Sequence, residues 1–204
     1  MAQRTKVLAT LLSVLLVLLS AGPAGAEPPA TNTAVHEQIV RAERAIDGRF
    51  SNLKDVVDST SMPLTGITRG GYLKGFGVVF TVQVNLLPVP NLGPFSGGMS
   101  EKDKASLNLR KRQRLEDLEI RARTILVEEG PRLTEVPAAE KVALVISLLH
   151  YPWEDVSGLP SQLVMQAQRQ LLIDHQAGRV NLPALKKQLE SAYFYKRPRQ
   201  ASDR

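Results

Sequence analysis

The chain contains no cysteine. Without thiols it can form no disulfide, no thiolate-based active site and no thiol-linked lipid anchor, so its fold must be held together by a hydrophobic core. Histidine is also scarce: the three residues are His36, His150 and His175, and none stands at a helical two-histidine spacing with an acidic partner. We therefore expect neither a metal site nor a bound cofactor.

Aromatic residues make up only 5% of the chain, which leaves few rings to stack on bases. Motifs of common enzymes are missing as well: there is no Gly-x-Ser-x-Gly elbow, no P-loop and no dinucleotide fingerprint. Adjacent helical carboxylates such as Glu116 and Asp117 diverge, so local geometry does not make them a glycosidase pair. The sequence favours a non-catalytic protein without a nucleic-acid partner.

Residues 1–26 have the pattern of a secretory signal peptide. Two cations precede an uncharged apolar run at 7–19, and Ala24 and Ala26 form the small-residue pair of a cleavage site. The run is shorter than the ~20 residues that cross a bilayer core. Cleavage after Ala26 predicts a periplasmic or extracellular protein, and an uncleaved anchor is the alternative.

The remaining chain has the length of one domain. We expect a polar leader at 27–32, a single α+β domain at 33–195 and a disordered basic tail at 196–204. Three prolines and three glycines at 87–100 predict a long loop within the domain.

Two long amphipathic helices are expected, at 33–59 and 101–129. The first has apolar residues at helical spacing: Val35, Ile39, Ala42, Ile46, Leu53 and Val57. The second is highly charged, has a narrow apolar stripe and ends at Gly130 and Pro131. Such a stripe suits packing on one surface or pairing with another helix, so self-association through helices is one expected interaction.

Strict alternation over residues 76–84 predicts a strand with Phe76, Val78, Phe80, Val82 and Val84 on one face. A weaker strand at 67–73 precedes it, with a turn at Lys74 and Gly75. At 141–149 and 161–168 periodicity leaves helix and strand both open, and β-branched content favours strands. We expect short helices at 169–177 and after Asn181.

The expected fold is therefore α+β, with amphipathic helices packed on a small antiparallel sheet built from two hairpins. The element order would be helix, hairpin, helix, hairpin and helices. The hairpin sequence of residues 71–84 and the segment 175–182 resemble a group of bacterial exported envelope proteins, a resemblance that follows the element order over most of the mature chain. No activity is established for that group, so the resemblance implies a compartment and the two later strands but no site residues.

One segment combines acid–base side chains with aromatic rings. It contains His150, Tyr151, Trp153, Glu154 and Asp155, directly after an apolar run. These residues are candidates for a hydrolase of an envelope substrate, with Trp153 as a candidate binding residue. The alternative is a loop at a strand end, in which the tryptophan covers the edge of the core.

The densest basic cluster is Arg110, Lys111, Arg112 and Arg114. It could bind anionic lipid or polysaccharide, but acidic residues shortly downstream favour a solvated, internally paired helix face. The sequence as a whole predicts an exported non-catalytic protein that acts through surface interactions, as an envelope accessory or assembly factor with an envelope protein as partner. The hydrolase and the anionic-surface binder are the alternatives.

Mass spectrometry of the natively expressed protein tests the export signal. We expect the mature chain to begin at Glu27, because signal peptidase cuts after a small-x-small motif. Intact Met1 in the membrane fraction would instead support an uncleaved anchor.

Overall fold

The computed structural model describes residues 32–51, 62–87 and 99–195. The chain divides into two units, Met1–Ala30 and Thr31–Arg204, and every described residue belongs to the second. The predictions of a signal peptide, a disordered tail, most of the 87–100 loop and the helix beyond residue 51 lie outside the described residues. No described helix is long and apolar enough to cross a membrane.

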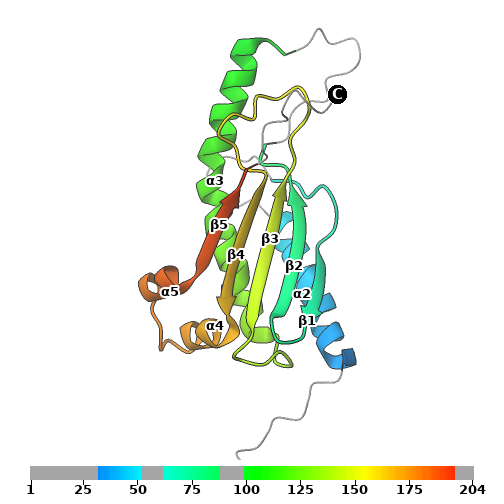
Figure 1. Ribbon diagram of the computed structural model, residues 1–204, viewed down its shortest axis with the longest axis vertical. Helices are drawn as coiled ribbons and strands as arrows, with labels where there is room; N and C mark the ends of the chain where they lie inside the picture. The colour runs from blue at the N-terminus through cyan, green and yellow to red at the C-terminus, as the bar shows by residue number, and fades with distance from the viewer. Residues whose placement is uncertain (1–31, 52–61, 88–98, 196–204) are drawn as a thin grey trace, which may run out of the picture. The chain divides into compact units, whose positions relative to one another are not determined.

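The fold is α+β, as predicted: its helices pack on a mixed five-stranded sheet (Figure 1). In chain order, the elements before the middle of the chain are α2 (Asn32–Ser51), β1 (Arg69–Leu73), β2 (Gly77–Val84) and α3 (Glu101–Glu129). After the 3₁₀ turn η2 (Gly130–Arg132) come β3 (Lys141–Leu148), β4 (Gln162–Gln168), α4 (Arg169–Gln176), α5 (Leu182–Gln188) and β5 (Glu190–Phe194).

The prediction of a purely antiparallel sheet is wrong. The strands follow one another in the order β1 to β5, and all neighbours are antiparallel except β2 and β3, which are parallel and pair from Gly77 with Lys141 to Val84 with Leu148. A parallel pair needs a long crossover connection, and the segment that contains α3 provides it. The two long strands at 141–148 and 162–168 settle the helix-or-strand alternative in favour of strands.

The strand β5 was missed by the sequence analysis, which expected only helices after residue 168. Helix α5 ends at Gln188 after about two turns, and the chain then pairs with β4. β5 has no buried residue, and its alternation of apolar and polar side chains is weak. Its conformation depends on the β4 ladder and not on a pattern of its own.

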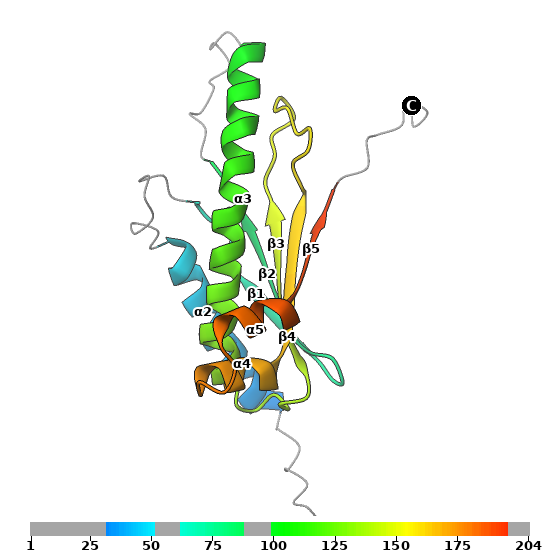
Figure 2. The same ribbon diagram turned by 90° about the vertical axis from the view of Figure 1, so that its left-hand side faces the viewer.

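The described helices α2, α3, α4 and α5 lie on one side of the sheet (Figure 2). Alternate residues of the central strands point under them and form the core, among them Val78, Phe80 and Val82, which were predicted to share a face. The same holds for Leu163, Met165 and Ala167 of β4. Phe76 does not belong to this set, because it lies in the turn between β1 and β2 and is exposed.

The helices contribute the other half of the core through the predicted stripes. In α2 the stripe is Val35, Ile39, Ala42 and Ile46, and in α3 it includes Leu107, Leu118, Ala122, Ile125 and Leu126. Ser100 caps α3 by accepting a hydrogen bond from the Asp103 amide, which satisfies one of the free donors at the helix start. An ion pair of Arg49 with Glu128 joins the two helices.

Two glycines explain the glycine-rich hairpin. Gly77 has a φ of 126°, and a Cβ there would collide with the carbonyl group of Lys141 on the parallel neighbour. A Cβ on Gly70 would overlap Ile39 of α2 and the ring of Phe80. The motif therefore lets β1 and β2 approach α2 and β3 closely, and its glycines are structural.

Phe80→Ala tests the core. The side chain is 1% exposed, so we expect the free energy of unfolding to fall by ~3–5 kcal/mol, because the truncation leaves a cavity under α2. Denaturant titration measures the loss. The matched control Val79→Thr alters the next residue on the opposite face and should cost less than ~1 kcal/mol. Equal losses in the two variants would contradict the assignment of the faces.

Candidate functional site

The candidate acid–base residues lie in the connection between β3 and β4, residues 149–161. This connection is fastened to the N-terminal half of α3 (Figure 1). The side-chain amide of Asn108 donates to the carbonyl oxygens of Asp155 at 2.9 Å and Ser157 at 3.0 Å. The loop is thus held by a buried polar side chain that the sequence analysis did not single out.

The centre of this contact is a buried ion pair. Lys111 Nζ lies 2.6 Å from Glu154 Oε2, and both side chains are 1% exposed. The prediction that Lys111 belongs to a solvated basic face is therefore wrong. Its position gave a signal: it follows the buried Leu107 by four residues and precedes Leu118 by seven, so it lies on the apolar stripe of α3.

His150 completes the cluster. Its Nε2 lies 2.8 Å from the carbonyl oxygen of Pro160, and since a carbonyl only accepts, Nε2 carries the hydrogen. Nδ1 faces Glu154 Oε2 at 3.7 Å, a charge-pairing distance that is too long for a hydrogen bond. Burial alone would raise the pKa of Glu154, but His150 and Lys111 together outweigh it and hold the pKa below its usual value.

The remaining residues of the predicted constellation do not converge on this carboxylate. Tyr151 and Trp153 stack on each other, with ring centroids 5.4 Å apart and planes 3° from parallel. Asp155 is exposed and accepts a hydrogen bond from the backbone amide of Ser157 at 2.9 Å, which lowers its pKa. The segment is therefore a structured loop with a charged anchor.

The basic cluster is divided by the fold. Arg110 and Arg112 are exposed, whereas Arg114 is half-buried and Lys111 is enclosed. The guanidinium of Arg112 lies beside Gly158, so it also borders the same loop. Of the four cations that are close together in the sequence, two are exposed to solvent. This weakens the prediction that the cluster binds anionic lipid or polysaccharide.

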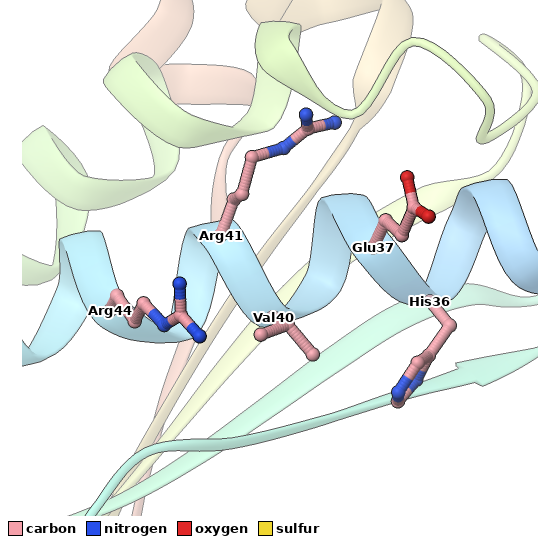
Figure 3. Close-up of a pocket in the computed structure, with 5 residues that line it drawn as sticks. All are labelled: His36, Glu37, Val40, Arg41 and Arg44. Carbon is pink, nitrogen blue, oxygen red and sulfur yellow. The ribbon is translucent and has the colours of Figure 1, made fainter.

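Two shallow hollows lie elsewhere on the surface. One has a volume of about 300 Å³, and its described lining residues belong to α2: His36, Glu37, Val40, Arg41 and Arg44. Figure 3 shows that Glu37 and Arg41 point to one side of the helix and His36 and Val40 to the other, so no set of groups meets at one point. Among the described residues, no group of three acidic or histidine side chains is placed to hold a metal ion.

The second hollow, of about 240 Å³, lies over the uncovered face of the sheet. Its lining comes from β2, from Ser147 of β3 and from the segment before β1: Thr65, Gly66, Ile67, Thr81, Val82, Gln83 and Ser147. The hydroxyl of Thr65 donates to Gln83 Oε1 at 2.9 Å. This lining is neutral, and sequence reasoning missed it because the residues come together only in the sheet.

Glu154→Gln tests whether the buried pair anchors the loop. The change leaves Lys111 buried without its counter-charge, so we expect the free energy of unfolding to fall by ~3–5 kcal/mol. Replacing both partners, by Lys111→Met with Glu154→Leu, should recover most of this loss, because an apolar pair carries no desolvation penalty. Denaturant titration of the three proteins measures the effect.

Two controls accompany this experiment. Arg112→Gln removes the exposed neighbouring cation and should cost ~0–1 kcal/mol. Because the folded pKa of Glu154 is lowered, its stabilisation is present above the unfolded pKa and is lost as the pH falls through the folded value, so the Glu154→Gln deficit should shrink at acid pH. A small, pH-independent deficit would contradict the anchor.

Comparisons with known proteins do not assign a role to Glu154 and the residues around it. No family model, curated protein or solved structure matches the chain. The arrangement around Glu154 is therefore identified by its own contacts as a buried anchor between α3 and the β3–β4 connection.

Proposed function

We propose that this is an exported, non-catalytic protein that binds an envelope protein through the uncovered face of its sheet, as an accessory or assembly factor. The observation that carries the proposal is the one-sided packing in Figure 2: the described helices cover one face, and none of them lies over the other. Export itself rests on the predicted signal peptide and on the resemblance to bacterial exported envelope proteins.

The uncovered face has the composition of a binding surface. Its centre is formed by aliphatic side chains in neighbouring registers, namely Val79, Ala143, Val145, Val164 and Ala192. Ala143 is 3% exposed although no described helix covers it. Large apolar side chains at the rim, Ile67, Leu73 and Phe194, are exposed. An apolar patch of this kind on an exported protein typically marks a site of protein interaction.

The charges favour a protein partner over an anionic lipid or polysaccharide. Thr81, Gln83, Ser147 and Gln166 place neutral hydrogen-bonding groups beside the aliphatic side chains of this face. Of its cations, Lys141 is paired with Glu190 at 3.1 Å, and Arg69 stands at the edge strand β1. Binding to an anionic lipid or polysaccharide surface would require a cluster of cations on the protein that attracts this surface at long range. A face that combines apolar side chains with neutral hydrogen-bonding groups resembles an interface between proteins.

The hydrolase alternative receives less support from the geometry. A general acid or base must reach a substrate proton, yet the Glu154 carboxylate is enclosed and its nearest polar neighbours are Lys111 Nζ and His150 Nδ1. The hollow on the sheet lacks titratable side chains. Both observations favour binding over catalysis.

Site-specific photo-crosslinking in the exporting cell tests the proposal. A photoreactive residue replaces Thr81 or Gln166 on the uncovered face, or Arg112 on α3 as the control position. We expect a discrete protein adduct from the first two positions, because a partner would bury them, and none from the third. Val164→Arg, placed between them on the same face, should abolish the adduct while denaturant stability stays within ~1 kcal/mol.

Adducts that form only from the Arg112 position would contradict the proposal. Adducts with lipid or polysaccharide, released at high salt, would favour the anionic-surface alternative. Adducts that survive Val164→Arg would show that the sheet face is not the contact surface.

A further inference from the structure

The two edges of the sheet differ in whether their outward-pointing backbone groups are bonded to side chains. At the β1 edge, two carboxylates of α2 bond to two of the backbone amides that point away from β2. Glu43 Oε1 accepts from the Gly70 amide at 2.6 Å, and Asp47 Oδ1 accepts from the Thr68 amide at 2.9 Å. A strand whose outward donors are already bonded to side chains is a poor template for another strand.

The β5 edge is different. The amide of Ser161 donates to the carbonyl of Phe194 at 2.7 Å, so the backbone of Phe194 faces β4. In an antiparallel ladder the facing alternates, and the backbone groups of Ser191 and Tyr193 therefore point away from the sheet. Within the described part of the chain, β5 is the last strand in the sheet order and has no strand on that side.

The strand is also held in an extended form that suits pairing. On the helix-covered side, the Tyr193 hydroxyl donates to the carbonyl of Leu115 at 3.4 Å, and the Ser191 hydroxyl lies 3.4 Å from Glu119 Oε1. On the other side, Ala192 and Phe194 are exposed, Phe194 to 51%. Figure 2 looks at the sheet from the side of β5: α3 stands beside the sheet, and α5 lies at the lower end of the near side, just before β5 begins.

We propose that a second copy of this chain pairs with β5 through its own β5, antiparallel and around a two-fold axis, so that the two sheets join into one. Each copy then supplies the backbone donors and acceptors of Ser191 and Tyr193 to the other. In such a pairing Phe194 of one copy lies beside Ala192 of the other on the uncovered face, a contact of aromatic and aliphatic side chains that favours association.

The described side chains of β5 favour a second copy as the occupant. Ala192 and Phe194 are apolar and exposed on the same face, so the segment is complementary to itself when two copies run antiparallel. The acidic residue of the strand, Glu190, is already paired with Lys141 of its own copy at 3.1 Å, so the pairing leaves no unpaired carboxylate charges of β5 to repel each other.

The capped β1 edge limits the assembly to a dimer. If β1 were free, β5 of one copy could pair with β1 of the next, and this head-to-tail contact would extend without end. With Glu43 and Asp47 covering β1, the pairing of β5 with β5 is the contact that remains, and it closes on itself. The inference goes beyond the proposed function, because it concerns the edge of the sheet and not its face.

Sedimentation velocity of the purified mature protein over a concentration series tests the inference. We expect a monomer–dimer equilibrium for the unaltered protein. Ser191→Pro removes an outward amide, together with the hydroxyl that contacts Glu119, and leaves the ladder to β4 intact, so it should raise the dissociation constant by more than about tenfold. Phe194→Lys should do the same by placing like charges around the two-fold axis.

Leu73→Lys is the matched control, because Leu73 is 57% exposed on the same face but belongs to the β1 edge. It should leave the equilibrium unchanged. Each variant is accepted only if its denaturant stability shows that it is folded, and either β5 variant alone suffices for the test.

A cross-link adds a positional readout, made simple by the absence of cysteine. Ala192→Cys would place two thiols, one per copy, on residues roughly 7–8 Å apart across the two-fold axis, within reach of a short bis-maleimide. Leu73→Cys should give no cross-linked dimer. A monomer at all concentrations would overturn the inference, and so would a dimer that both β5 variants leave intact, which would instead support association through helices.

Discussion

The parallel pairing of β2 with β3 determines where the other elements lie. Two parallel neighbours cannot be joined by a tight turn, so the chain must cross from one end of the sheet to the other, and α3 makes that crossing. Once α3 lies on one face, the residues of the central strands that point toward it form the core. The opposite face is left to solvent or to a partner, and the proposed function follows from this asymmetry.

The same crossover explains why charges are buried in a protein that has so few chemical motifs. The N-terminal half of α3 continues along the stripe that farther down packs on the sheet, and there the connection between β3 and β4 covers it. Lys111 lies on that stripe, so the loop must bring a counter-charge, and Glu154 supplies it. Such a pair adds little net stability compared with an apolar one, but its loss on one side is costly, which makes the loop position specific.

The edges of the sheet complete this account. Two carboxylates of α2 bond to backbone amides at the β1 edge. β5, the last strand in the chain and in the sheet order, has outward backbone groups that no described strand pairs with, and it carries exposed apolar side chains. An uncovered face and one open edge meet at Phe194. If two copies join at this edge, the faces become one continuous surface, and a partner would meet a site twice as wide.

The sequence by itself determined the elements that have a strong pattern of their own. Helix α3 has the predicted bounds, the alternation of β2 identified its buried face, and the β-branched run at 141–148 forms a strand. These follow from local periodicity, which reflects the face that each element buries. Only the tertiary structure decided the parallel pairing of β2 and β3, the strand β5 and the burial of Lys111. Each depends on contacts between residues far apart in the chain: a ladder supplied by a neighbour in the sheet, or a carboxylate brought by a loop 43 residues away. A local sequence pattern does not identify partners that lie far away in the chain. For this reason the sequence predicted a solvated Lys111, whereas in the structure its side chain is buried against Glu154.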